Sequence, residues 1–291
     1  CFMLSIENLS FNYKKDKYIL KDVNVNINPG INILLGKNGV GKSTFIKILA
    51  KVQKSSSKIS LNGLPISHPS YLEHITYLPQ NFSLYENLKV AEIIEFVASM
   101  KGIKRNERKN IVDSILEKAH ITEYKNMFFS KCSEGTKRRV GIAALLIGNY
   151  DLYLLDEPTA GLDPVERINF YAIVKEYMRD KIVIISTHVM DDLACISDFV
   201  LMLSEQKISF YGDYASFLNS FTDKLYEIIP EDTLVENEQS IRILSRSTIN
   251  NKISYHVLLD NTDISNLRRR YPSLRKISPD IEAVSYTHLT L

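Results

Sequence analysis

The sequence has few cysteines, and none is spaced like a metal ligand. Cys1, Cys132 and Cys195 are the three cysteines in 291 residues, and they form no CxxC pair and no cluster with the six histidines. This spacing argues against both a disulfide framework and a zinc site. We therefore expect a reducing compartment.

Long apolar runs are also absent. The longest ones, such as VGIAALLIG and KIVIIS, are much shorter than the roughly 20 residues that a helix needs to cross a bilayer. The chain does not open with a basic segment followed by an apolar one, so no signal peptide is predicted. Any membrane association is expected to come through a partner.

The chain has no strong excess of charge of either sign. Its 36 Lys and Arg residues and 34 Asp and Glu residues give a formal net charge of +2. This near-balance gives no global reason to expect nucleic acid or an acidic membrane as the main partner. There is also no internal repeat, low-complexity tract, long coiled coil or basic tail. With 45% hydrophobic residues, the chain is expected to be globular, with one substantial core and a small second domain.

The order of apolar segments predicts an α/β fold with a mainly parallel sheet. The alternating segments LSIENLSF and KYILKDVNVNI indicate an N-terminal antiparallel β part. The buried strands INILL, DLYLLDEP and KIVIISTH alternate with helical segments, as in parallel sheets. Two helical stretches, LKVAEIIEFVASMKGI and RKNIVDSILEKAHI, predict an inserted helical subdomain at about 84–148, with a basic polar link from Lys104 to Lys109 between them.

A change in composition near Ser220 predicts a domain boundary. We expect a main domain at 3–220 and a small α+β accessory domain at 221–291, made of short strands and the short helix NLRRRYP. Met3 is a natural start, so Cys1 and Phe2 are interpreted as upstream read-through. The closing VSYTHLTL resembles translated sequencing adapter, and the end of a small domain is the alternative interpretation.

The segment GKNGVGKS stands between a predicted strand and a predicted helix, which is the pattern of a phosphate-binding loop. Its glycines allow backbone N–H groups to converge on a phosphate at a helix N-terminus, where the helix dipole favours an anion. Lys42 is expected to reach the β and γ phosphates, and the Ser43 hydroxyl to ligate Mg²⁺. The predicted nucleotide-binding residues of this segment are Gly36, Lys37, Asn38, Gly39, Val40, Gly41, Lys42, Ser43 and Thr44.

Two adjacent carboxylates, Asp156 and Glu157, end the apolar strand DLYLLDEP. Asp156 is expected to hold hydrated Mg²⁺, and Glu157 to polarise the attacking water. Either residue alone is most often a plain loop acid. Together with Lys42 they indicate a site for nucleotide hydrolysis.

The order GKNGVGKS, Gln80, SEGTKRR, LYLLDEP, AGLDP and STH resembles the nucleotide-binding subunit of ABC transporters over residues 3 to about 220. This resemblance implies an ATP hydrolase coupled to transport, with ATP and Mg²⁺ as cofactors. It also implies that KCSEGTKRRV is the signature segment, whose Ser133 and Gly135 act on the ATP of a second subunit in a head-to-tail dimer.

Four further positions are assigned by the resemblance alone. Tyr13 would stack on adenine, Gln80 would contact the metal or the attacking water, Asp163 would cross the dimer interface, and His188 would hydrogen-bond the γ-phosphate. Each assignment has a plain alternative. These are an ordinary core or surface tyrosine, an unremarkable glutamine at a strand end, a helix N-cap before Pro164, and a structural histidine.

The signature segment departs from the family's usual LSGGQ. Here it is CSEGT, in which Ser133 and Gly135 match and Glu134 introduces a carboxylate. The retained basic residues beside it favour a divergent working motif over an inactive one. The triplet from Lys137 to Arg139 is interpreted as the solvated start of a helix rather than a nucleic-acid contact, because the total charge is nearly balanced.

The segments NFSLYENLKV, GLDPVERINF and STHVMDDLACISD resemble the subgroup that works with separately encoded, exporter-type membrane subunits. This implies a peripheral protein on the cytoplasmic face of the cell membrane, a transmembrane permease subunit and a second ATP-binding subunit, identical or different, with no nucleic acid. Phe82, Leu84 and Tyr85 would line the docking groove or simply pack beneath their loop. Two other functions stay open: a soluble ABC ATPase that acts on nucleic acid or ribosomes, and an inactive regulator.

Overall fold

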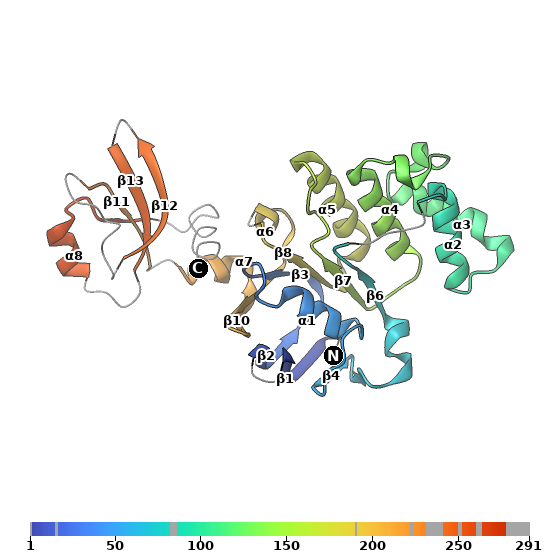
Figure 1. The fold of residues 1–291 in the computed structure, drawn as a ribbon, viewed down its shortest axis with the longest axis horizontal. Coiled ribbons are helices and arrows are strands. Elements are labelled where there is room, and N and C mark those ends of the chain that lie inside the picture. The colour runs from blue at the N-terminus through green and yellow to red at the C-terminus, as the bar shows by residue number, and fades with distance from the viewer. Residues whose placement is uncertain are drawn as a thin grey trace.

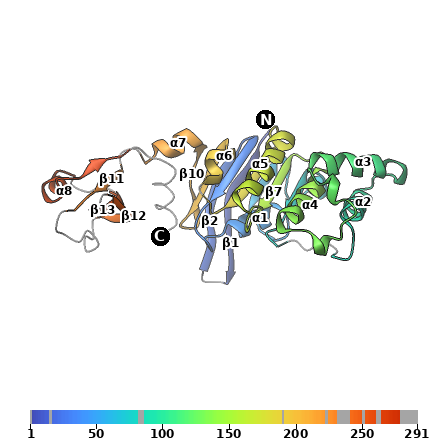
Figure 2. The same ribbon diagram turned by 90° about the horizontal axis from the view of Figure 1, so that it is seen from above.

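The computed structural model describes residues 2–14, 17–81, 86–189, 191–221, 224–230, 241–249, 252–259 and 264–277. Figure 1 shows a central body of sheets and helices, with a helical region at one end and a small lobe of strands at the other. The view from above in Figure 2 shows the same arrangement. Among the described residues, no helix has the length and apolar character to span a membrane.

A six-stranded sheet with the order β10-β9-β3-β8-β7-β6 forms the centre of the main body. Its neighbouring strands are parallel except at β10, which pairs antiparallel with β9. The strands are β3 (Gly30–Leu35), β6 (Ile75–Leu78), β7 (Leu152–Asp156), β8 (Ile182–Thr187), β9 (Phe199–Ser204) and β10 (Lys207–Asp213). Every residue of β3, β7 and β8 is buried, which explains their continuous apolar sequences. The predicted α/β fold with a mainly parallel sheet is confirmed.

A second sheet of four antiparallel strands, with the order β2-β1-β4-β5, covers one side of this centre. Its strands are β1 (Leu4–Lys14), β2 (Lys17–Ile27), β4 (Lys58–Leu61) and β5 (Leu64–Pro65). Helix α1 (Lys42–Leu49) contributes Phe45 and Leu49 to a core shared with Leu152 and Ile184 of the parallel sheet. The short 3₁₀ helix η1 (Pro69–His74) leads into β6.

The opposite face of the parallel sheet is covered by helices. Phe170 and Val174 of α5 (Pro164–Met178) share a core with Leu155, Val183 and Ile185. Side chains alternate across a strand, so Leu155 and Ile185 face this core while Leu154 and Ile184 face the other. The shorter helices α6 (Asp191–Ile196) and α7 (Tyr214–Asn219) extend the same layer.

The predicted helical region contains α2 (Val90–Met100), α3 (Arg105–Lys118), η2 (Thr122–Tyr124), η3 (Phe129–Lys131) and α4 (Glu134–Leu146). Ile94, Leu116 and Val140 bring α2, α3 and α4 together in one core. The prediction of a link from Lys104 to Lys109 is wrong, since α3 begins at Arg105. The first buried residue of α3 is Val112, so its solvated first turn has the composition of a loop.

In the described residues, the C-terminal lobe is an antiparallel sheet with the order β12-β13-β11-β14, accompanied by helix α8. Its elements are β11 (Leu225–Ile228), β12 (Arg242–Ile249), β13 (Lys252–Leu258), α8 (Ile264–Arg270) and β14 (Arg275–Lys276). Tyr255, Val257, Leu267 and Tyr271 form its own core. The closing VSYTHLTL lies outside the described residues.

Candidate functional site

The loop GKNGVGKS joins β3 to α1 at the carboxyl edge of the parallel sheet. Gly41 precedes α1 with a φ of 117°, in the region that favours glycine. A Cβ on Gly36 would lie 2.5 Å from the backbone oxygen of Leu203. The backbone conformation therefore requires glycine at position 41, and the close approach of the neighbouring strand requires glycine at position 36.

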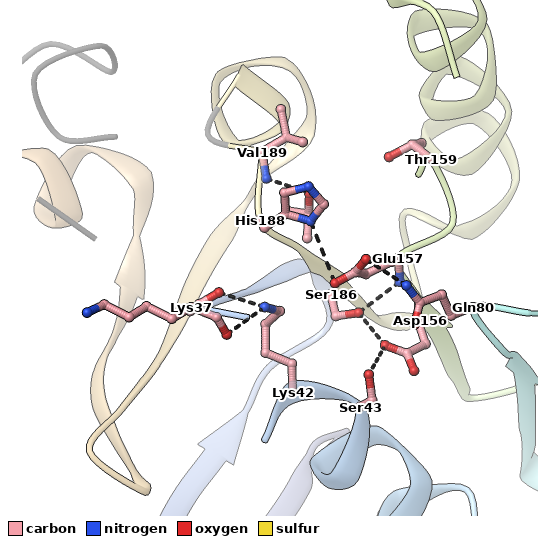
Figure 3. A network of polar contacts seen from close by, with 12 residues as sticks. Lys37, Lys42, Ser43, Gln80, Asp156, Glu157, Thr159, Ser186, His188 and Val189 are labelled. Carbon is pink, nitrogen blue, oxygen red and sulfur yellow. Dashed lines mark hydrogen bonds and ion pairs between the residues drawn. The ribbon is translucent and has the colours of Figure 1, made fainter. Parts of the chain in front are cut away.

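Lys42 is a buried cation at the start of α1. Its Nζ donates hydrogen bonds to the backbone oxygens of Gly36 at 2.6 Å and Lys37 at 3.1 Å (Figure 3). Burial lowers the pKa of Lys42, while the charges of Glu157 and Asp156 oppose this effect. A buried ammonium held by neutral carbonyl groups in a glycine-rich cradle fits a phosphate ligand, which would compensate its charge.

Ser43 and Asp156 connect the loop to the end of β7. The Ser43 hydroxyl donates to Oδ1 of Asp156 at 3.0 Å, and the Ser186 hydroxyl donates to the same oxygen at 2.7 Å. Hydroxyl and carboxylate oxygens are suitable ligands for Mg²⁺. The sequence reasoning missed Ser186, although it belongs to the STH motif. The serine also accepts the backbone N–H of Glu157 at 2.8 Å and so orients the next residue.

Glu157 has a left-handed backbone, with a φ of 45°. Such a conformation costs about 1–3 kcal/mol in a residue other than glycine and is typical of functional sites. Oε2 of Glu157 accepts a hydrogen bond from Nε2 of Gln80 at 3.0 Å, and its Oε1 lies 3.6 Å from Nδ1 of His188 (Figure 3). The fold therefore brings Glu157 together with Gln80, 77 positions earlier in the chain, and with His188, 31 positions later.

The imidazole of His188 follows the end of β8. Within the described part of the chain, its Nδ1 is buried and has no hydrogen-bond partner, since its distance of 3.6 Å to Oε1 of Glu157 is too long for a hydrogen bond. A buried polar atom without a partner costs free energy unless a ligand satisfies it. This nitrogen is consistent with the role at the γ-phosphate that the resemblance implies.

Tyr13, on β1, lies beside the phosphate-binding loop. It lines a hollow of about 190 Å³ together with Gly41, Thr44 and Glu157. The residue is 61% exposed, and its hydroxyl lies 3.3 Å from Oγ1 of Thr44. An exposed ring at this place could stack on a nucleotide base.

The signature segment forms the start of α4. Ser133 is the N-cap, and its Oγ accepts the backbone N–H of Thr136 at 3.1 Å. The carboxylate of Glu134 is exposed and pairs with Lys137 at 3.0 Å. Thus Ser133 and Gly135 lie at the first turn of a helix, where backbone N–H groups can bind an anion.

The interpretation of Lys137 to Arg139 as a solvated helix start is wrong for its two arginines. Arg138 is 9% exposed, and its Nη1 donates to the backbone oxygen of Gln80 at 2.8 Å. Nη2 of Arg139 donates to Oε2 of Glu166 at 2.7 Å. Tertiary contacts between α4 and its neighbours, which the local sequence does not reveal, bury these charges.

Asp163 begins α5. Its Oδ1 accepts the backbone N–H of Glu166 at 2.9 Å, and Pro164 occupies the first turn. The structure thus shows the helix N-cap that was the plain alternative, while a role across a dimer interface stays a prediction. The three groove residues Phe82, Leu84 and Tyr85 lie outside the described residues.

Comparisons with known proteins agree on one family. The ABC transporter family model matches residues 20–160. An uncharacterized ABC transporter ATP-binding protein of Methanocaldococcus jannaschii is 32% identical over 72% of this chain and 77% of its own length. The lantibiotic transport ATP-binding protein SrtF of Streptococcus pyogenes is 34% identical over 73% of this chain and 91% of its own length.

A solved structure of cbiO1 from Clostridium perfringens, part of the ABC transporter complex cbiONQ, covers 75% of this chain and 91% of its own, with 28% identity and a TM-score of 0.67. Other curated relatives are much longer, and the chain spans about a third of two ABC transporter A family members of Dictyostelium discoideum. The phosphate-binding loop, the carboxylate strand and these similarities lead to one conclusion: the chain belongs to the ABC transporter family, among the ATP-binding proteins that couple ATP hydrolysis to transport.

Proposed function

We propose that this chain binds Mg²⁺-ATP at the loop GKNGVGKS and hydrolyses it to power export by a separate membrane subunit. The observation that carries this proposal is the hydrogen bond between Ser43 and Asp156, which joins the phosphate-binding loop to the carboxylate strand. Beside this bond lies the pair of Gln80 and Glu157. A phosphate-binding element, a metal-binding pair and a base thus meet at one sheet edge.

Each residue has a role in this proposal. Lys42 binds the terminal phosphates, and Ser43 and Asp156 hold the metal ion. Glu157 orients the attacking water and takes up its proton, while Gln80 holds the glutamate carboxylate and contributes to the metal site. His188 hydrogen-bonds the γ-phosphate. When bound, ATP would supply the phosphoryl group, and Mg²⁺ held by Ser43 and Asp156 would neutralise the charge that develops during its transfer.

We also propose that Ser133 and Gly135 complete the nucleotide site of a second subunit, and that Asp163 crosses the dimer interface toward the phosphate-binding loop of that subunit. Ser133 already accepts the N–H of Thr136, and its Oγ lies 3.0 Å from the Thr136 hydroxyl. If the threonine donates this bond, the serine proton stays available for a phosphate oxygen. The charge of Glu134, in the first turn of the same helix, would repel a phosphate.

A membrane partner and a place on the cytoplasmic face of the membrane complete the proposal. Its support is the similarity to SrtF, which is named for lantibiotic transport, and to cbiO1, which is part of a transporter complex. A peptide, antibiotic or lipid-like compound is the class of substrate that we propose. The alternative of a nucleic-acid-binding ATPase is less well supported, since Arg138 and Arg139 form contacts within the chain.

The test is the oligomeric state of Glu157→Gln protein, measured by light scattering with and without Mg²⁺-ATP. We expect bound ATP, hydrolysis at least about a hundredfold slower than in the parent, and a shift from monomer to dimer, because the substitution removes the carboxylate that takes up the proton. The control is Lys42→Ala, which should neither bind ATP nor dimerise. Parental hydrolysis by Glu157→Gln would overturn the catalytic assignment, and ATP binding without dimerisation would show that the closed dimer requires a partner other than a second copy of this chain.

A further inference from the structure

Arg138 connects the signature helix to the candidate catalytic site of the same subunit. It lies on α4, five positions after the N-cap Ser133, and its side chain is almost fully buried. Its Nη1 donates to the backbone oxygen of Gln80 at 2.8 Å. This bond links a helix of the helical region to the segment that follows β6 of the parallel sheet.

Gln80 needs such an anchor. Strand β6 ends at Leu78, so the hydrogen-bond ladder between β6 and β7 does not extend to Gln80. The residue itself is exposed. Yet its Nε2 donates to Oε2 of Glu157 at 3.0 Å, which requires a defined position of its backbone. A charged donor bound to the carbonyl oxygen of the same residue fixes that position.

We propose that Arg138 is a positioning residue for the reaction, which acts through Gln80 on Glu157. This inference rests on the proposed function, in which Glu157 activates water and Ser133 contacts the nucleotide of a second subunit. Because Ser133 caps the helix that carries Arg138, a shift of the helix start also moves the anchor of Gln80. Contact of Ser133 with the nucleotide of the second subunit is thereby coupled to the positions of Gln80 and Glu157 in this subunit.

The neighbouring Lys137 provides a matched control. It lies one position earlier on the same helix and pairs with the exposed Glu134 instead of the sheet. Substitution of Lys137 removes one positive charge from α4 and leaves the bond to Gln80 in place. A general effect of charge on α4 would affect both variants equally.

The experiment compares steady-state ATP hydrolysis by the parent, Arg138→Met, Lys137→Met, Gln80→Ala and the Gln80→Ala/Arg138→Met double variant. Methionine keeps much of the aliphatic volume of both basic side chains and removes the donor groups. We expect a kcat about tenfold lower for Arg138→Met, because a displaced catalytic group slows the reaction, with a KM for ATP within about twofold of the parent. Lys137→Met should resemble the parent. The double variant should be no slower than Gln80→Ala, because Arg138 acts through that side chain.

A second measurement does not depend on hydrolysis. Hydrogen exchange in the nucleotide-free protein, followed by mass spectrometry, should be faster in the peptide containing Gln80 and Asn81 for Arg138→Met than for the parent or Lys137→Met. Unchanged exchange, or multiplicative losses of kcat in the double variant, would overturn the role of Arg138. Absence of hydrolysis by the parent would instead reject the proposed function, and the exchange data would still decide whether Arg138 positions Gln80.

Discussion

Gly135 lies directly against Glu166. A Cβ built on Gly135 would be 2.8 Å from Oε2 of this glutamate, the oxygen that accepts the hydrogen bond of Arg139 at 2.7 Å. The backbone N–H of Glu166 is in turn bound by Asp163. One glutamate therefore joins the starts of α4 and α5, and the signature glycine leaves space for its side chain within the same subunit.

This contact predicts that Gly135→Ala changes stability differently in two backgrounds. Alanine in a helix is favoured over glycine by about 0.5–1 kcal/mol. In the parent, this gain should be cancelled or reversed, because the new Cβ displaces the carboxylate from Arg139. In a Glu166→Ala background, the same substitution should raise the free energy of unfolding by about 0.5 kcal/mol. Urea unfolding of the four proteins measures the difference, and an equal effect in both backgrounds would disprove the contact.

Tyr13 is expected to contribute to nucleotide binding through its ring. Stacking of a base on an aromatic side chain is worth about 1–3 kcal/mol, so Tyr13→Ala should raise the Kd for ATP about tenfold. Tyr13→Phe should bind nearly as well as the parent, since it loses only the contact with Thr44. Titration with a fluorescent ATP analogue measures these constants.

Tyr18 is a suitable control for this prediction. It is an exposed tyrosine on β2 whose ring contacts Lys21. Tyr18→Ala should leave the Kd unchanged. Equal weakening by Tyr13→Ala and Tyr18→Ala would show that the effect does not come from stacking at the phosphate-binding loop.

Ser43 is expected to set the dependence of hydrolysis on Mg²⁺. Loss of even an indirect metal partner commonly costs 10–100-fold in metal affinity, so Ser43→Ala should raise the Mg²⁺ concentration for half-maximal hydrolysis at least about tenfold. Ser43→Thr keeps the hydroxyl and should stay close to the parent. A Mg²⁺ titration at saturating ATP tests this. If the Mg²⁺ titration curves of Ser43→Ala and the parent coincided, Ser43 would be excluded as a metal ligand.

We propose that residues 221–291 form a separate domain, and the buried carboxylate of Glu227 allows a test. Burial opposes ionisation, but hydrogen bonds from Ser254 and Arg275, together with the arginine charge, lower the pKa of Glu227 below its usual value of 4.5. A lowered pKa stabilises the fold above the usual value. This stability is lost as the pH falls from about 4.5 through the lowered pKa.

Arg275→Ala should therefore destabilise the C-terminal lobe at neutral pH by about 1 kcal/mol, because the arginine is exposed and solvent screens its charge, and Glu227 keeps the hydrogen bond from Ser254. Glu227→Gln should cost less and should remove this part of the acid dependence. Hydrogen exchange of the peptide spanning 252–259 reports on the lobe, and ATP binding reports on the main body. If Arg275→Ala weakened ATP binding as well as the lobe, the two domains would not be independent.

Much of the architecture follows from the sequence because the relevant patterns are local. The continuous apolar runs of β3, β7 and β8 identify strands buried on both faces, and GKNGVGKS identifies the loop at their edge. The start of α3 was not predictable in this way, since its solvated first turn resembles a loop. The sequence order of motifs also sufficed to recognise the family.

The contacts between distant segments depend on the tertiary structure. The local sequence marks Arg138 as one charge in a basic triplet, whereas the packing of α4 against the segment after β6 turns it into a buried donor to Gln80. Likewise, Ser186 becomes the partner of Asp156 because β7 and β8 are neighbours in the sheet. A side chain's identity is written in the sequence, but its partner depends on which elements the fold brings within hydrogen-bonding distance.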